Sequence, residues 1–319
     1  MTAPTIEVVV PTVGRPSLHA ALAPLLGRLP VVVVDDRVSG PELELPEGVR
    51  VLRSWGGGPA AARNAGWRAT SAEWVAFLDD DVLPPADWVE QLIADLVACG
   101  PEVGATQGRL RVPLPVDRRP TDWERSTAGL ETALWATADM AYRRSALELV
   151  GGFDERFPRA YREDADLGLR VTGDGWRIVR GSRAVDHPVR PAPWQQSIRS
   201  QRGNADDVLM GALHGPDWRR RASVPPGRRP WHLATTGALL VSLHPRWRRR
   251  GLLAWLALTA DFARRRIAPG PRSPHEVATM TVTSAVVPIA ATVWWLAGWA
   301  RLPRLLRRAG PFPAAPSRT

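Results

Sequence analysis

Lysine is absent from this chain of 319 residues, so all 42 of its basic residues are arginines. Enzymes that transfer nucleotidyl groups usually hold the attacking phosphate with a lysine, and its absence counts against that reaction. Cysteine occurs once, at Cys99, which excludes a disulfide framework and a thiolate metal cluster. The sequence has no zinc finger and no aromatic and basic RNA signature, so we expect no nucleic-acid partner. No basic and then apolar signal peptide opens the sequence, so we expect no secretory leader.

Positive charge is spread unevenly over the chain, whose formal net charge is +10. Much of it follows Arg199, where arginine runs occupy 219–221, 248–250, 264–266 and 307–308. A basic end of this kind favours anionic lipid or phosphorylated substrates as partners. The length allows one large α/β domain with an appendage. We place these two parts at residues 1–215 and 216–319.

Three consecutive carboxylates, Asp79, Asp80 and Asp81, follow an apolar run at Val75–Leu78. The run is typical of a buried strand, and two prolines shortly after it end regular structure. Acidic side chains at such a strand end are costly unless compensated, and a Mg²⁺ or Mn²⁺ ion that carries phosphate is a common compensation. In strand geometry Asp79 and Asp81 point toward the ligand and Asp80 points away. The alternative is a solvated acidic turn that caps a following helix.

Two other predicted strands also end in polar residues. Pro11-Thr12 follows the first strand, and Asp35-Asp36 follows the second. Continuous apolar strands joined by a helix indicate a parallel sheet, in which ligands bind at the carboxyl ends of the strands. We therefore expect three polar strand ends to share one edge. The elements expected here are strands at Ile6–Val10, Val31–Val34 and Val49–Leu52 and a helix at Leu18–Leu26.

A glycine-rich loop, Gly56–Gly58, opens a helix that carries Arg63 and Asn64. Backbone N–H groups at such a helix start can receive a phosphate. The spacing of the glycines fits neither the P-loop nor the dinucleotide-binding fingerprint. By itself, such a stretch is more often an ordinary loop.

These segments occur in the order seen in family 2 glycosyltransferases of the GT-A fold, which the chain resembles over about residues 5–190. Asp139–Arg144, Gly151–Phe157 and Glu163–Arg170 resemble the acceptor-side half of that family. The resemblance implies an α/β fold with a mostly parallel, Rossmann-like sheet flanked by helices and a helical C-terminal appendage. It also implies inverting transfer of a sugar from a nucleoside-diphosphate donor to a hydroxyl of a glycan, lipid or cell-envelope intermediate.

The resemblance assigns the donor to the strand ends and the glycine-rich helix. Thr12 would lie under the nucleobase, and Arg63 would approach the diphosphate, although a surface arginine is an equal alternative. The leaving diphosphate gains charge that Mn²⁺ or Mg²⁺ stabilises, with Asp81 as a ligand. Arg37-Val38 stand where the family often has Gly-Ser, which leaves the nucleobase open. The donor residues implied are Pro11, Thr12, Arg15, Asp35, Asp36, Arg63, Asp79 and Asp80.

The acceptor hydroxyl must lose a proton as it attacks, and Asp164 matches the general base of the family. Glu163 and Asp166 share the same helix turn, where acids are favourable near the N-terminus, so capping is the alternative for them. His187 precedes a proline and lies where many members place a metal-binding histidine. The resemblance thus implies Asp81 and His187 as metal ligands, with an ordinary loop residue as the alternative for His187.

Three features surround the expected acceptor side. Arg109–Arg125 is rich in proline and arginine and predicts a loop. Trp123 and Trp135 either line the acceptor cleft or pack in the core. Trp194–Leu213 predicts a helix that covers the acceptor.

The C-terminal region contains apolar segments that arginines flank. Val277–Ala300 is about long enough to span a bilayer, whereas Leu233–Leu243 and Leu252–Phe262 are too short. Its tryptophans and the arginines after it resemble an interfacial anchor. We expect peripheral contact with an anionic membrane at the cytoplasmic face rather than a span. The alternative is a set of helices that pack in an appendage.

Two other functions remain open from the sequence. A nucleotidyltransferase also uses a nucleotide-binding sheet and acidic metal ligands, but it usually needs the lysine that this chain lacks. A scaffold protein that keeps the fold without catalysis would have no use for Asp81, Asp164 and His187.

Overall fold

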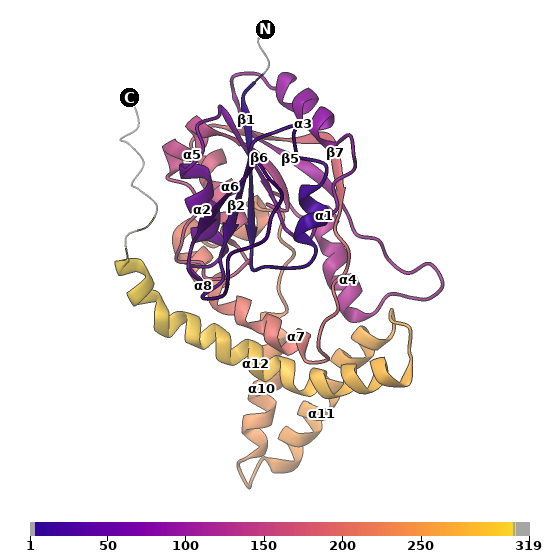
Figure 1. The fold of residues 1–319 in the computed structure, drawn as a ribbon. Helices are drawn as coiled ribbons and strands as arrows, with labels where there is room; N and C mark the ends of the chain where they lie inside the picture. Colours follow the sequence, from indigo (N-terminus) through magenta and orange to yellow (C-terminus); the bar gives the residue numbers. More distant parts are fainter. Residues whose placement is uncertain (1–3, 309, 311–319) are drawn as a thin grey trace.

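The structure is a computed structural model that describes residues 4–308 and residue 310. A seven-stranded sheet forms its centre, with helices packed around it and a helical C-terminal region below (Figure 1). The strand order is β3-β2-β1-β4-β6-β5-β7, and β6 runs antiparallel to both of its neighbours while the other pairs are parallel. The expected α/β fold with a mostly parallel sheet is confirmed. The strands are β1 Ile6–Thr12, β2 Val31–Asp35, β3 Val49–Arg53, β4 Trp74–Leu78, β5 Val103–Arg111, β6 Asp139–Arg143 and β7 Arg177–Asp186.

Helices before residue 216 are short, and the two longest helices follow it. The first group is α1 Leu18–Leu22, α2 Pro59–Arg68, α3 Trp88–Val97, α4 Asp122–Ala128, α5 Arg144–Val150, α6 Glu163–Gly173, α7 Gln196–Arg199 and α8 Gly203–His214, with the 3₁₀ turns η1 Gly129–Thr132 and η2 Ser200–Arg202. The second group is α9 Trp218–Arg221, α10 Arg229–Ser242, α11 Arg248–Ile267 and α12 Pro274–Arg307.

The residues of β2 alternate between two cores, which explains its unbroken apolar sequence. Val31 and Val33 pack in the core that contains residues of α1 and α3. Val32 and Val34 pack in the core that contains residues of α2 and α6. Because both faces of the sheet are buried, a ligand can approach only at an edge, and the carboxyl ends of the strands carry the polar residues.

Two sequence expectations are wrong at their boundaries. The first helix ends at Leu22 rather than Leu26, and turns follow it. The loop expected over Arg109–Arg125 is regular at both ends. Its first three residues continue β5 and pair with β7, and its last four begin α4. α4 starts there because Thr121 and Glu124 form a capping box, a signal that the arginine-rich composition obscured.

The helix expected over Trp194–Leu213 is divided into α7, η2 and α8. Gly203 opens α8, and a Cβ at this position would lie only 2.4 Å from the ring of Tyr161. The chain therefore passes close to Tyr161 where the helix changes its path.

α12 lies across the base of the sheet domain and packs against α7, α8, α10 and α11 (Figure 1). Among the described residues it is the one helix that is long and apolar enough to cross a membrane, and 33% of its apolar window is buried inside the protein. A helix that packs against the rest of its own chain can be equally long and apolar, so these two properties do not show a membrane span. Leu209, Trp218 and Leu302 share one core, so packing is continuous across residue 215, and the boundary placed there remains a prediction.

A buried arginine of β7 tests how the sheet is held together. Arg183 is fully buried and pairs with Asp139 at 2.7 Å and Asp95 at 3.0 Å. We predict that Arg183→Met lowers the free energy of unfolding by about 3–5 kcal/mol, because it leaves buried carboxylates without their partner. Arg177→Met is the matched control on the same strand, since its pair with Glu102 is exposed, and we expect less than about 1 kcal/mol. Urea unfolding measures both, and equal losses would contradict this account.

Candidate active site

The carboxyl ends of β1, β2 and β4 meet at one edge of the sheet, as their parallel pairing requires. A cleft of about 720 Å³ opens at this edge, and residues of α6, α7 and η2 also line it. All the site residues predicted from the sequence line this cleft except Asp35. Those that do are Pro11, Thr12, Arg15, Asp36, Arg63, Asp79, Asp80, Asp81, Asp164 and His187.

The three carboxylates after β4 all border the cleft, so the expected alternation is wrong. The strand ends at Leu78, and the turn that follows does not keep strand geometry. Asp80, expected to point away, accepts a hydrogen bond from Thr12 Oγ1 at 2.5 Å and pairs with Arg15. Burial raises the pKa of Asp80, and its contacts with Thr12 and Arg15 oppose that shift. Asp80 therefore links the ends of β1 and β4.

Arg63 connects the two walls of the cleft. It is buried on α2, where its guanidinium donates to Asp79 Oδ1 at 2.8 Å and to Glu163 Oε1 at 3.0 Å. Burial alone would lower the pKa of Arg63, but the charges of Asp79 and Glu163 raise it, so Arg63 stays protonated. Burial and the neighbouring Asp164 raise the pKa of Glu163. The alternative of a surface arginine is wrong, and the predicted contact with a diphosphate remains a prediction.

Asp35 and Asp36 have different surroundings at the end of β2. Asp35 is buried, and the Arg37 guanidinium holds its pKa below the ordinary value, with two hydrogen bonds of 2.8 Å. Asp36 accepts from Ser54 Oγ at 2.7 Å and from Gly58 N at 3.0 Å, which fixes the glycine-rich loop. Arg37, which stands where the family often has glycine, thus forms hydrogen bonds with Asp35, the carboxylate predicted to contact the nucleobase. That contact of Asp35 with a donor stays a prediction.

Asp81 and His187 lie beside each other, with 3.6 Å between Oδ1 and Nε2. Two backbone hydrogen bonds between Leu83 and Asp186 hold the two segments together. A cation with bonds of about 2.1 Å fits between such an oxygen and nitrogen. No group of three or more acidic, histidine or cysteine ligands occurs among the described residues, so metal binding by Asp81 and His187 stays a prediction.

Arg190 is a residue that the sequence did not reveal, and its Nε lies 3.0 Å from Asp81 Oδ2. A cation that binds Asp81 would have to compete with this ion pair. The cleft also exposes Arg199 and Arg202 from the segment expected to cover the acceptor. The sequence indicated Arg199 and Arg202 as exposed residues of that segment, whereas nothing marks Arg190 in a chain whose basic side chains are all arginine. Trp123 lines the cleft and donates to Arg190 O at 2.8 Å, whereas Trp135 is buried in the core.

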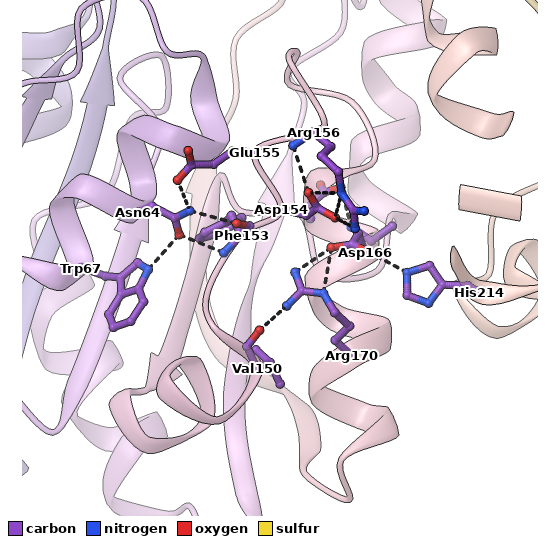
Figure 2. Close-up of polar contacts among 12 residues, drawn as sticks. Asn64, Trp67, Val150, Phe153, Asp154, Glu155, Arg156, Asp166, Arg170 and His214 are labelled. Carbon is purple, nitrogen blue, oxygen red and sulfur yellow. Dashed lines mark hydrogen bonds and ion pairs between the residues drawn. The ribbon is translucent and has the colours of Figure 1, made fainter. Parts of the chain in front are cut away.

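Asp164 and Asp166 lie in the first turn of α6 but face different surroundings. Asp164 lines the cleft and accepts the N–H of Ala165 at 2.7 Å. Asp166 is buried, accepts from Arg170 at 2.6 and 2.9 Å, and meets His214 Nε2 at 2.7 Å (Figure 2). Asp166 therefore anchors α6 to α8, and Asp164 is the one of the two that lines the cleft, so its role as the base stays a prediction.

The pKa values of these two carboxyls shift in opposite directions. Burial raises the pKa of Asp164, although its hydrogen bond from Ala165 and the charges of Arg63 and Arg162 oppose the rise. Burial would also raise the pKa of Asp166, but Arg170 and His214 hold it below the ordinary value. A carboxyl with a raised pKa accepts a proton more readily, which suits a base.

Asn64 joins the glycine-rich helix to the turn that precedes α6 (Figure 2). Its amide donates to Phe153 O and accepts from Phe153 N, both at 2.9 Å, and also accepts from Trp67 Nε1 at 2.9 Å. Gly152 has a φ of 77°, and a Cβ there would lie 2.5 Å from Asn64 Oδ1. Only glycine fits, so these two sequence motifs form one structural unit.

Comparison with known proteins gives a consistent result. Residues 7–140 match the model of glycosyl transferase family 2. Over 212 residues the chain is 31% identical to the pre-mycofactocin glycosyltransferase of Mycobacterium tuberculosis, which covers 59% of this chain and 44% of that protein. Over 219 residues it is 28% identical to the O-antigen biosynthesis protein RfbC of Myxococcus xanthus. That match covers 55% of this chain and 16% of RfbC. The chain thus matches less than half the length of these relatives.

A solved structure shares the fold over most of the chain. It is the mannosyltransferase PcManGT from Pyrobaculum calidifontis in complex with GDP-Man and Mn²⁺, with a TM-score of 0.53 at 19% identity, covering 92% of this chain and 88% of that one. At this identity the likeness concerns the fold alone. The matched segment, the fold and the order of the motifs agree. Residues 7–140 are thus similar to glycosyltransferase family 2, and the chain has the GT-A fold.

Proposed function

We propose that this protein is an inverting glycosyltransferase that moves a sugar from a nucleoside-diphosphate donor to an acceptor hydroxyl. The observation that carries the proposal is the single cleft in which donor-side strand ends and Asp164 meet. Named glycosyltransferases among its relatives support a transferase. The resemblance to the family implies one base and a single displacement, which inverts the anomeric centre.

The proposed donor half begins with Pro11 and Thr12 of β1 and Arg15 of the loop after it. It also comprises Asp35 at the end of β2, Asp36 after it, Arg63, Asp79 and Asp80. The protonated Arg63 lies beside the position where the diphosphate charge would build up, because Asp79 holds it at the cleft. Asp81 and His187 would bind Mn²⁺ or Mg²⁺, which supplies positive charge to the leaving diphosphate. The Mn²⁺ and GDP-Man in the mannosyltransferase structure support this choice.

The acceptor half centres on Asp164. Its carboxylate would accept the proton of the attacking hydroxyl, and the contacts of Asp166 with Arg170 and His214 keep the helix turn in place. Arg162 precedes this turn with a φ of 80°, and its pair with Asp207 at 2.9 Å maintains that strained conformation.

A second cavity of about 810 Å³ adjoins the cleft and shares Trp123 and Arg190 with it. Phe262, Met280 and Val287 give this cavity an apolar wall. An acceptor that carries an apolar part next to its hydroxyl fits such a surface, which supports a lipid-linked or glycan intermediate of the cell envelope. We place the reaction at the cytoplasmic face of the membrane, and the O-antigen biosynthesis relative supports this setting.

Asp164→Asn tests the base. We predict a loss of turnover of about two to four orders of magnitude, because the amide cannot accept the proton. Nucleotide affinity should persist, since the donor residues lie on the other wall. Asp166→Asn is the matched comparison in the same helix turn and should lower stability more than turnover. If Asp164→Asn loses turnover and nucleotide affinity together, Asp164 is structural or binds the metal.

The pH profile of turnover tests the same residue independently. Because burial raises the pKa of Asp164 above its ordinary value of 3.8, the base is ionised only above that raised pKa. We predict that kcat/KM falls as the pH decreases through a value higher than 3.8. An acid limb at or below 3.8, or none at all over the range where the protein is folded, would exclude Asp164 as the base.

Asp81→Ala tests the metal site. We predict that calorimetry with a nucleoside diphosphate detects Mn²⁺-dependent binding for the parent protein and loses it for Asp81→Ala. Asp117→Ala, an exposed acid outside the cleft, is the control and should bind as the parent does. Unchanged Mn²⁺-dependent affinity in Asp81→Ala would refute the assignment.

A further inference from the structure

The hairpin of α10 and α11 projects from the body of the molecule beyond α12 (Figure 1). Its end carries large apolar side chains with high exposure, including Leu243 at 74% and Leu253 at 68%. We define the hairpin tip by the exposed residues Leu240, Val241, Leu243, Trp247, Leu252 and Leu253. An apolar surface of this kind on a projecting element marks an interaction site.

The two helices already contact each other, so the tip residues do not face the groove between them. Gly251 lies so close to α10 that a Cβ there would be 2.5 Å from Ser242 N and 2.9 Å from Ala238 O. His232 of α10 and Phe262 of α11 stack with their ring centroids 5.4 Å apart. The inner faces are thus filled, and the leucines of the tip point outward.

Charge around the tip has one sign. Residues 218–260 contain no aspartate or glutamate, and four arginines, Arg246 and Arg248–Arg250, surround the end of the hairpin. All four are exposed. Two of them stack near Trp247, with Arg246 at 6.0 Å and Arg250 at 5.1 Å from its ring centroid. In the part of the chain that the structure describes, none of the four takes part in an ion pair.

We propose that the hairpin tip inserts into the headgroup region of an anionic phospholipid bilayer. Leucines would bury apolar surface at the acyl boundary, and Trp247 would lie at the interface. Arg246 and Arg248–Arg250 would extend to lipid phosphates, which adds attraction that salt weakens. A second copy of this chain is a poor occupant, because pairing two tips would bring these arginines together.

Two of the three tryptophans of α12 have partners within the protein, whereas Trp299 is 53% exposed. Trp294 stacks with Arg202 at 5.7 Å, and Trp295 stacks with Arg229 at 5.4 Å. α10 has 14 residues, which corresponds to a length of about 21 Å. A bilayer at the tip would therefore lie about that far from the second cavity, which Arg228 and His232 line at the base of the hairpin.

The test uses the full chain and vesicles without any donor or acceptor, so its result is independent of the proposed function. We expect flotation with phosphatidylcholine vesicles that contain phosphatidylglycerol and much weaker flotation with phosphatidylcholine alone. Leu243→Glu combined with Leu253→Glu should reduce binding about tenfold or more, because two apolar contacts become repulsive. The matched control combines Val116→Glu with Leu149→Glu, which are exposed apolar residues away from the hairpin, and should bind as the parent does.

A second measurement does not depend on loss of binding. An environment-sensitive dye at Leu253→Cys, in a Cys99→Ser background, should shift to the blue with anionic vesicles, and a dye at Val116→Cys should not. Equal binding by the hairpin and control variants, or no dye shift at Leu253→Cys, would overturn the proposal. A third outcome would also overturn it. If the parent does not bind vesicles but forms a dimer in light scattering, and Leu243→Glu with Leu253→Glu dissociates that dimer, the tip is an interface between copies.

Discussion

A buried ion pair network through Arg63 holds the two halves of the cleft in register. Its guanidinium contacts Asp79 at the end of β4 and Glu163 at the start of α6, two positions that lie far apart in the sequence. Losing Arg63 would leave the buried Glu163 carboxyl without its partner, which is expensive. The position of Asp164, next to Glu163, therefore depends on the same arginine that contacts Asp79. In the proposed reaction, this one side chain would couple the donor geometry to the acceptor geometry.

Much of the donor side follows from local pattern. Apolar runs that end in Pro11-Thr12, Asp35-Asp36 and Asp79–Asp81 predicted strands whose ends meet, and the parallel pairing brings them together. The local sequence pattern could not predict where side chains point once the chain has left a strand. Asp80 turns toward Thr12 because the chain leaves strand geometry at Leu78, and Asp35 turns toward Arg37 because an arginine replaces the family glycine.

Contacts between residues far apart in the sequence also could not be predicted from the sequence. Arg190 meets Asp81 only because β7 returns to the same edge, and every other basic residue of the chain is also arginine. The different surroundings of Asp164 and Asp166 depend on His214, a residue of α8 that no motif marks. In the C-terminal region, composition indicated a membrane, but only the packing of α12 against α8 and the projection of the α10–α11 hairpin distinguish which segment is available.

The central claim is that one cleft performs a single displacement with one carboxylate base. The most direct test is the anomeric configuration of the product, read by NMR after reaction with whichever nucleotide sugar the protein turns over from a donor panel. The account predicts a product whose anomeric configuration is opposite to that of the donor. A product that retains the donor configuration would contradict it, because a displacement from the face opposite the leaving diphosphate inverts the anomeric centre.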